Sequence, residues 1–207
     1  LLSLINEILD LSKVEAGKMQ VEPRDSAVAE LVEFARRTFG PVAEQKHLGF
    51  LTEVGAEVPA TVFTDPKRLQ QILKNLLSNA FKFTSTGQVT LRIRMADTEE
   101  RFAAPELVEA DQVLAFSVID TGIGIPEDKQ KLIFEAFQQA DGTTSRKYGG
   151  TGLGLSISRE IAKLLGGEIK VSSAPGKGST FTLFVPQTYV PVTSTMRSQQ
   201  LAASSGN

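Results

Sequence analysis

The chain lacks several features that would place it in well-defined protein classes. It contains no cysteine among its 207 residues, which excludes disulfides and thiolate metal sites and fits a reducing compartment. No apolar run approaches the roughly 20 residues that a membrane-spanning helix needs. The formal net charge of −2 provides no basic footprint of the kind that nucleic-acid binding uses. The content of 41% hydrophobic and 22% charged residues is ordinary for a globular protein.

The start of the chain, LLSLINEILDLS, has no marks of a signal peptide, since it carries neither a basic segment nor a cleavage site. It also has no initiator methionine, so we expect a fragment of a longer protein. Leu4, Ile8 and Leu11 recur at helical spacing and Gly17 is a stop signal, which predicts a helix over residues 1–18. This helix either packs on its own domain or is half of a bundle. Its abrupt start in mid-pattern favours the bundle.

The remaining pattern alternates between helices and strands. Predicted helices cover Val28–Phe39 (closing near Gly40–Pro41, or continuing over Val42–Lys46), Pro66–Phe83 and the segment that ends at Gly166–Gly167. Predicted strands cover Leu48–Val54, Thr61–Thr64, Val89–Met95, Val113–Ile119, Ile169–Val171 and Phe181–Val185. The acidic stretch 97–111 is interpreted as a loop or hairpin excursion, and the Ser- and Thr-rich stretch 187–207 as a linker or tail. This pattern predicts an α/β sandwich, with one mixed sheet covered on one face by about three helices.

The segment DPKRLQQILKNLLSNAFKFT, residues 65–84, carries two stripes on one predicted helix. Asp65 is a predicted N-cap, followed by proline at the first helical position. Asn75, Asn79 and Lys82 recur at i, i+4 and i+7 and form a polar stripe. Amide oxygens ligate hard cations, and amide N–H groups and lysine contact phosphates, so we interpret this stripe as facing a metal-bound nucleotide. The adjacent stripe, predicted to be buried, consists of Leu69, Ile72, Leu76, Ala80 and Phe83.

Three glycine-bearing segments follow. In DTGIG (120–124) the carboxylate can accept a hydrogen bond from a base amino group, and Gly122 and Gly124 let the backbone pass close to a flat ring; a plain turn is the alternative. GGTGLGL (149–155) leads into a helix, whose N-terminal N–H groups suit anionic phosphates; a flexible loop is the alternative. Its spacing fits neither a Rossmann turn nor a P-loop. GKGSTF (176–181) by itself predicts a hairpin turn.

The order of these segments resembles the ATP-binding catalytic domain of sensor histidine kinases, within the wider group of gyrase-, Hsp90- and MutL-like ATP-binding domains. NLLSNAFKFT is similar to the N box of that family, DTGIGIP to its G1 box, IFEAFQQAD to its F box, GGTGLGLSI to its G2 box and GKGSTF to its G3 element. The resemblance covers roughly residues 24–186. ILDLSKVEAGK is similar to the end of the second helix of the family's dimerisation and phosphotransfer domain. FQQAD and the trailing tail are most similar to hybrid kinases, which continue into receiver domains.

The resemblance implies a two-layer α/β sandwich of the Bergerat ATP-binding type, a mixed sheet covered by helices, with an N-terminal helix from a dimerisation bundle. It divides the chain into three parts. Residues 1–22 would be the end of the dimerisation and phosphotransfer helix, residues 23–187 the ATP-binding catalytic domain, and residues 188–207 a flexible linker or tail.

The resemblance also implies roles for single residues. Asn79 would be the Mg²⁺ ligand, Asn75 and Lys82 would contact phosphate oxygens as the catalytic residues, and Asp120 would bind the adenine amino group. Phe83 would contact the nucleotide or, equally well, be a core aromatic. Phe134 and Phe137 would anchor a mobile lid over about residues 138–149. The other implied nucleotide-binding residues are Gly122, Gly124, Gly150, Thr151, Gly152, Leu153, Gly154 and, at the adenine end through water, Thr180.

Two departures from the family pattern stand out. Gln138 and Gln139 occupy the region where many members have an arginine that reaches the γ-phosphate; Arg146 or Lys147 would substitute for it, or be a solvated charge. The family's phosphoacceptor histidine precedes the DLSKVEAGK helix, whereas His47 follows it, so His47 is interpreted as structural. We therefore expect the fragment to bind ATP but not to phosphorylate itself at the usual site.

The implied function is transfer of the ATP γ-phosphate to a histidine on the dimerisation domain, for relay to a response regulator aspartate in two-component signal transduction. The alternative is an ATP-hydrolysing or nucleotide-gated module of the same superfamily. Such hydrolases carry a glutamate base one turn before the Mg²⁺-binding asparagine, where this chain has Asn75, an amide that cannot take a proton from water. The implied partners are the chain's own dimerisation domain, in a homodimer, and a receiver domain or response regulator. No nucleic acid or direct membrane contact is expected, and the implied location is cytoplasmic, whether or not the parent protein is anchored in the inner membrane.

Overall fold

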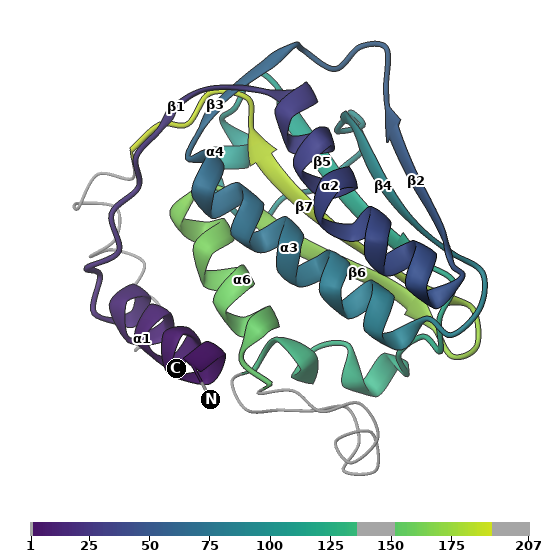
Figure 1. Cartoon of the computed structure of the whole chain (residues 1–207). Helices are drawn as coiled ribbons and strands as arrows, with labels where there is room; N and C mark the ends of the chain where they lie inside the picture. Colours follow the sequence, from purple (N-terminus) through teal and green to yellow (C-terminus); the bar gives the residue numbers. More distant parts are fainter. Residues whose placement is uncertain (1, 136–151, 192–207) are drawn as a thin grey trace.

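A mixed β-sheet forms the centre of the molecule, and helices cover one of its faces (Figure 1). The computed structural model describes residues 2–135 and 152–191. Five strands lie in the order β2-β4-β5-β7-β6, in which β2 runs parallel to β4 and the other neighbours are antiparallel. The strands are β2 (Gly49–Val54), β4 (Gln88–Met95), β5 (Val113–Asp120), β6 (Glu168–Ala174) and β7 (Gly178–Pro186).

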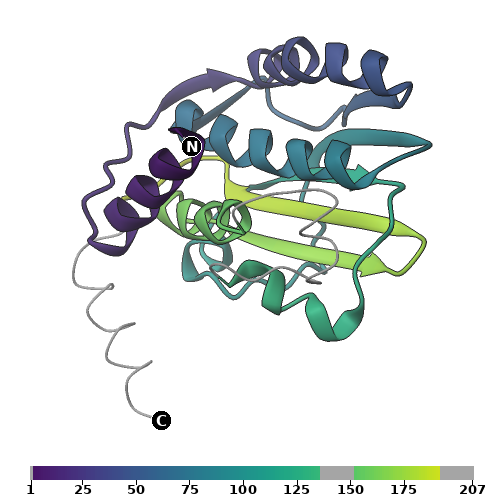
Figure 2. The ribbon, with the colours of Figure 1, turned by 60° about the horizontal axis from the view of Figure 1, so that its bottom comes forward.

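Three long helices, α2 (Val28–Lys46), α3 (Pro66–Phe83) and α6 (Gly154–Leu164), pack on the same face of the sheet. Figure 2 shows α2 and α3 above the strands. Apolar side chains of these helices and of every second position of β4, β5 and β7 form one buried core. The predicted α/β sandwich is thereby confirmed.

Alternation along β5 decides which face its last residue occupies. Leu114, Phe116 and Val118 belong to the core under the helices, whereas Val113 and Ala115 belong to a smaller apolar cluster on the other face. Since successive side chains of a strand point to opposite faces, Asp120 follows the first set onto the helix-covered face.

Helix α3 has the predicted bounds. Asp65 caps it, because its Oδ1 accepts hydrogen bonds from the N–H groups of Lys67 and Arg68 at 2.9 and 3.1 Å. Four of the five predicted core positions are buried, but Phe83 is only half-buried. It is the last residue of α3, and the loop after Asp120 lies against it. Phe81 enters the core instead and stacks on Phe39 with ring centroids 5.6 Å apart.

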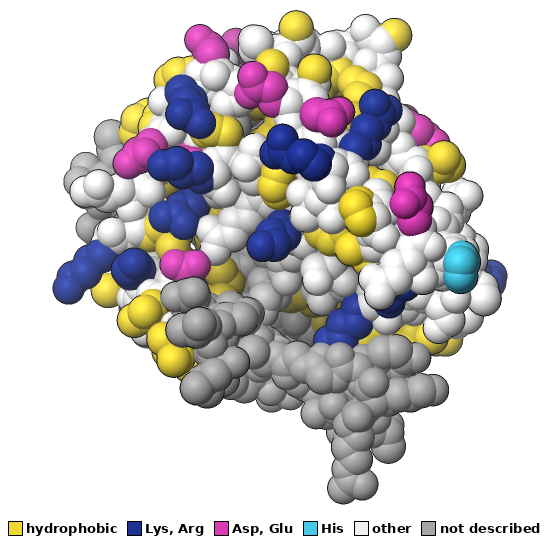
Figure 3. Space-filling view, viewed as in Figure 1, with side chains coloured by type: hydrophobic (Ala, Val, Ile, Leu, Met, Phe, Trp, Pro, Cys, Tyr) yellow, Lys and Arg dark blue, Asp and Glu magenta, His cyan; other side chains and the backbone are white. Residues whose placement is uncertain are grey.

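Helix α2 continues through Pro41, so the expected stop at Gly40–Pro41 is wrong and the alternative of a continued helix is right. Phe39 and Ala43 are both buried, which shows that the apolar face extends past the proline, while Pro41 itself is exposed. The helix ends at His47, which has a left-handed φ of 55° and is exposed (Figure 3).

The acidic stretch 97–111 is not merely a loop, because part of it covers the second face of the sheet. It contains α4 (Pro105–Val108), whose Leu107 is buried. Phe102 packs edge-on against Phe184 of β7 at 5.2 Å between ring centroids. The carboxylate of Glu168 accepts hydrogen bonds from two backbone N–H groups of this stretch.

A two-stranded ribbon, β1 (Arg24–Ala27) with β3 (Thr61–Thr64), lies beside the main sheet. The sequence pattern predicted β3 but missed β1. The chain after β7 joins this ribbon, since Phe63 exchanges backbone hydrogen bonds with Gln187 and Tyr189. The residues of the predicted tail from 192 onward lie outside the described part, and the domain boundaries stay predictions.

Helix α1 (Leu2–Glu15) packs against the helical layer and ends before Gly17, which has a φ of 65°. Val14 is buried there, whereas Ile8 and Leu9 are 42% and 50% exposed. The helix thus packs on its own chain and also presents apolar side chains outward. Within the described residues, no helix has both the length and the apolar character needed to cross a membrane.

Candidate functional site

The polar stripe of α3 lies along the side of the helix that faces α6. Asn75, Asn79 and Lys82 are all half-buried. Asn75 donates a hydrogen bond from Nδ2 to Oγ of Ser158 on α6, at 2.9 Å. Burial lowers the pKa of Lys82, and its Nζ lies 4.9 Å from the ring centroid of Phe83. The predicted stripe therefore exists as one surface.

The N-terminus of α6 approaches this stripe closely. A Cβ added at Gly154, the first residue of α6, would come within 3.0 Å of Oδ1 of Asn75. Glycine at this position therefore allows the N-terminus of α6 to lie beside the amides of α3. Amides, a lysine and a helix N-terminus together favour an anionic ligand.

The surrounding surface carries further positive charge. Figure 3 shows Lys and Arg side chains spread over the helical face of the molecule. Helix α3 alone contributes Lys67, Arg68, Lys74 and Lys82. The overall charge of −2 thus conceals a helical face with local positive charge.

Asp120 provides the acidic side of the site, at the end of β5. It is 7% exposed, and its Oδ1 accepts a hydrogen bond from the N–H of Gly122 at 2.8 Å. Burial raises the pKa of the carboxyl group, while backbone hydrogen bonds from Gly122 and Ser179 partly oppose the shift. A buried carboxylate whose remaining acceptor capacity faces the helical layer can receive an amino group.

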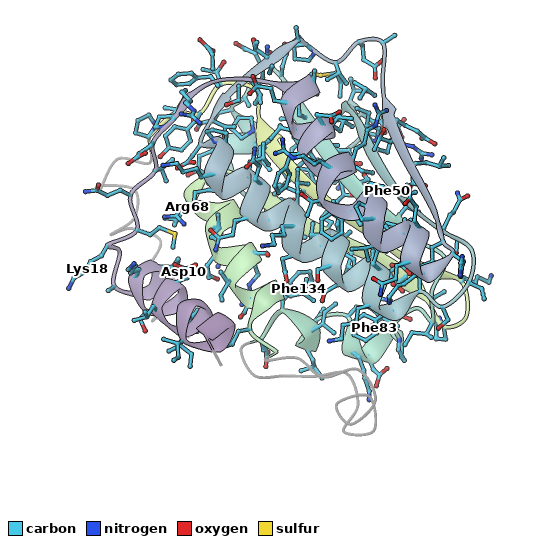
Figure 4. All side chains as sticks on the ribbon, in the orientation of Figure 1. Asp10, Lys18, Phe50, Arg68, Phe83 and Phe134 are labelled. Atoms are coloured by element: carbon cyan, nitrogen blue, oxygen red, sulfur yellow. The ribbon has the colours of Figure 1, made fainter. Side chains whose placement is uncertain are left out.

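The loop after Asp120 joins this carboxylate to the end of α3. A Cβ at Gly122 would come within 3.0 Å of the backbone O of Phe83, so only glycine fits there. Figure 4 shows Phe83 at the C-terminal end of α3, with Phe134 also on this side of the molecule. Phe134 is buried and packs edge-on against Phe181, at 6.3 Å between ring centroids.

Comparison with known proteins agrees with this geometry. Residues 64–189 match the family described as histidine kinase-, DNA gyrase B- and HSP90-like ATPases. The chain belongs to this family. The matched range contains α3, the loop after Asp120 and α6, which together form the site.

Relatives place the chain among histidine kinases. Hybrid signal transduction histidine kinase B of Dictyostelium discoideum is 39% identical over 90% of this chain, and sensor protein GacS of Pseudomonas syringae pv. syringae is 43% identical over 87% of it. The crystal structure of full-length ShkA in complex with AMPPNP has a TM-score of 0.74 and 29% identity, over 92% of this chain and 36% of that chain. The chain spans only 9% and 19% of the two sequence relatives. The resemblance to the catalytic domain of sensor histidine kinases is confirmed.

One predicted family residue is not brought to the site. Thr180 pairs with Ile119 and therefore lies on the face of the sheet opposite to Asp120. Ser179 pairs with Asp120, is 7% exposed and donates its backbone N–H to the carboxylate. The alternation of Phe181 with the later core positions of β7 would have identified Ser179, because it has the same parity as they do.

The remaining predicted residues divide into two groups. Leu153 is fully buried, so its side chain belongs to the core, and Gly152 has a φ of 72° just before α6. Gly124 packs against the hairpin of β6 and β7. The predictions for Phe137, Gln138, Gln139, the lid at about 138–149, Arg146, Lys147, Gly150 and Thr151 lie outside the described residues.

The donor set fits a single Mg²⁺ ion that reaches the protein with a phosphate ligand. Among the described residues there is no cluster of three or more His, Asp or Glu side chains that would hold a metal by itself. Asn79 offers an amide oxygen, which suits a hard cation, and Mg²⁺ commonly uses only one or two protein ligands beside phosphates and water.

Proposed function

We propose that this chain is the ATP-binding catalytic part of a two-component sensor histidine kinase, which transfers the γ-phosphate of ATP to a histidine on the dimerisation domain. The observation that carries this proposal is the placement of buried Asp120 on the same face as the amide and lysine stripe of α3. Asp120 suits the base of a nucleotide, and the stripe of α3 suits its phosphates. The family membership and the named relatives support the assignment.

Asp120 would accept the adenine amino group, and its burial makes this recognition strong, because a charge-assisted hydrogen bond gains strength away from water. Phe83 is half-buried beside this loop, which favours a contact with the nucleotide over a purely core role. The base is thus selected by a hydrogen bond at the end of β5.

Lys82 and Asn75 would bind phosphate oxygens, and Asn79 would hold Mg²⁺. Mg²⁺, when bound, supplies charge neutralisation at the β- and γ-phosphates. The lowered pKa of Lys82 reports the cost of partly burying its ammonium, which a phosphate would offset. Catalysis would then rest on positioning the γ-phosphate for attack by a histidine from outside this chain.

Asn75 separates this proposal from an ATP hydrolase of the same family. Its side chain is an amide, which has no basic site for a proton from water, and it already donates to Ser158. No glutamate occupies that position on α3. The site therefore favours transfer to a separate nucleophile over hydrolysis.

Further parts of the proposal concern partners and place. The dimerisation domain in a homodimer and a receiver domain or response regulator would be the partners, as the hybrid relative suggests. The residues of α1 that face outward, Ile8 and Leu9, would belong to that bundle. We also propose a cytoplasmic location for this chain.

Calorimetry with Mg²⁺–ATP tests the binding half of this proposal. Asp120→Ala and Asn79→Ala should each weaken binding by about tenfold or more, since each removes a contact to a charged or metal-bound group. Ser78→Ala, an exposed neighbour on α3, is the matched control and should leave binding unchanged. Absence of Mg²⁺–ATP binding by the unchanged chain would refute the proposal.

Phosphotransfer in trans tests the catalytic half. The chain is mixed with γ-labelled ATP and a separate dimerisation domain that carries an intact histidine. Label on that histidine, absent from a His→Ala acceptor, is the expected result. Rapid release of free phosphate without any acceptor would instead support the hydrolase.

A further inference from the structure

We infer that Ser173 and Gln130 are positioning residues for the base-binding loop, residues 121–126. They fix its position relative to Asp120 and thereby set the selectivity of the site for its base. This inference rests on the proposed function, because it concerns the same Asp120 site. Neither residue was identified from the sequence pattern. Both lie outside the segments that carry the family resemblance to nucleotide binding.

Ser173 lies in a row of three side chains that crosses the sheet below the site. Ser179 pairs with Asp120 across β5 and β7, and Ser173 pairs with Ser179 across β7 and β6. All three therefore lie on the helix-covered face. The hydroxyl groups of Ser173 and Ser179 are 3.0 Å apart. The row thus connects the base-binding carboxylate with the far edge of the sheet.

The hydroxyl group of Ser173 also reaches the loop itself. Its Oγ accepts a hydrogen bond from the N–H of Ile125 at 2.8 Å and lies 2.8 Å from the backbone O of Gly178, to which it can donate. If the Ser173 hydroxyl group donates to the backbone O of Gly178, its oxygen can accept hydrogen bonds from both the N–H of Ile125 and the hydroxyl group of Ser179. The hydroxyl group then uses its one donor and both of its acceptor sites. The loop after Asp120 is therefore tied back to the hairpin that carries Ser179.

Gln130 closes the same connection from the other side. One amide nitrogen, Nε2, donates to the backbone O of Ile125 at 3.1 Å and to that of Ser173 at 2.8 Å. The N–H of Gly176 adds a third tie, at 2.7 Å to the backbone O of Ile123. The loop is thus anchored along its second half to β6 and to the turn that follows β6.

The opposite end of the loop is anchored independently. Thr121 accepts a hydrogen bond at Oγ1 from the N–H of Gln88 at 3.0 Å, and its own N–H donates to the backbone O of Gln88. With both ends held, the segment around Gly122 has a fixed distance from the plane that a base would occupy beside Asp120. Loss of the Ser173 and Gln130 anchors would loosen the second half of the loop, where the tie from Gly176 to Ile123 remains, and would leave the Thr121 end in place.

The test compares ATP, GTP and ADP binding, each with Mg²⁺, by calorimetry on the unchanged chain, Ser173→Ala and Gln130→Glu. Glutamate has nearly the shape of glutamine but faces two carbonyl oxygens without a donor. Each variant should weaken the binding of ATP about five- to tenfold and that of GTP by a smaller factor, so that the preference for ATP over GTP falls. The ADP-to-ATP ratio should stay unchanged, because the phosphate side of the site is not altered.

Ser172→Ala is the matched control, since Ser172 is the neighbouring serine on the exposed opposite face. It should change neither affinity nor preference. Gln130 lies on a partly exposed turn, so its variant keeps the test decisive if Ser173→Ala fails to fold. An unchanged ATP-to-GTP preference in a folded variant overturns this inference. A wild-type chain that binds no Mg²⁺–ATP would instead overturn the proposed function.

Discussion

Replacement of Gly124, which packs against the β6–β7 hairpin, by alanine is expected to destabilise the fold more than the same change at Gly176, which lies in the turn of that hairpin. Their φ values are nearly equal, 69° and 73°. A left-handed conformation costs alanine about 1–2 kcal/mol, and loss of freedom in the unfolded chain returns about 0.4–1 kcal/mol. Gly176→Ala has nothing within 4 Å of the new Cβ, so about 0–1.5 kcal/mol should be lost there.

Gly124→Ala adds a steric term. Its Cβ would come within 3.0 Å of the backbone C and O of Ala174, which cannot rotate away as a side chain can. Overpacking of this kind costs typically about 1–3 kcal/mol, so the total loss should be about 1–4.5 kcal/mol. Since the hairpin must move away from the loop, Mg²⁺–ATP binding should weaken as well.

Urea denaturation of the two variants and the unchanged chain measures both losses, with the m-values as a check that unfolding stays two-state. The decisive quantity is the difference in unfolding free energy between the two alanine variants. Equal losses would refute the argument, because they would show that the close approach to Ala174 contributes nothing. A large loss at Gly176 alone would refute it too.

Three further predictions follow from the same contacts. Asp65→Ala should lower the free energy of unfolding by about 1–2 kcal/mol in urea denaturation, because it removes the cap of α3 and the bond from the N–H of Glu22 to Oδ2. Phe81→Ala, a truncation in the core, should lower the free energy of unfolding by about 3–5 kcal/mol. Phe83→Ala should lower it much less but weaken the binding of ATP, measured by calorimetry. On the proposed function the ionised form of Asp120 would bind adenine, and burial raises the pKa of this carboxyl group from 3.8, so the affinity for ATP should fall as the pH decreases towards that raised pKa. Binding should then release protons, which calorimetry in two buffers measures, and Asp120→Asn should abolish this release.

The sequence predicted α3 to the residue because local signals agreed there. Asp65 and Pro66 mark its start by cap chemistry, and the apolar spacing continues to its end. Strand positions in β4 and β5 followed from period-two patterns and apolar runs in the same way. Where local propensity and tertiary packing point in one direction, a single sequence is sufficient.

Other features depended on partners far away in the chain. Strand β1, RDSA, has no strand-like pattern and exists because it pairs with β3. Pro41 does not end α2, since the buried face continues to Ala43. The segment that covers the second face of the sheet depends on the contact between Phe102 and Phe184, which no local sequence pattern indicates. These contacts required the tertiary structure.

The site residues show the same division. Asp120, Asn75 and Lys82 stood out because their residue types and spacing have chemical meaning. The family resemblance implies Thr180, but the register of β7 against β5 places Ser179 opposite Asp120, and a shift of one residue reverses the face. Ser173 and Gln130 were missed because a serine in a strand and a glutamine in a turn acquire meaning only through the partners they contact.

Helix α3 contacts α1 near one end and carries the proposed phosphate-binding residues further along. Near the N-terminal end of α3, Gln71 donates to Oδ2 of Asp10 on α1 at 2.9 Å. Figure 4 shows Arg68 at this end of α3, with Asp10 across from it, and Phe83 at the other end. Four residues, or about 6 Å of helix, separate Gln71 from Asn75. A displacement of α1 that acted through Gln71 would therefore reach the helix that carries the amides of the proposed nucleotide site. The element that resembles the acceptor-bearing bundle is therefore in direct contact with the helix that would hold the phosphates.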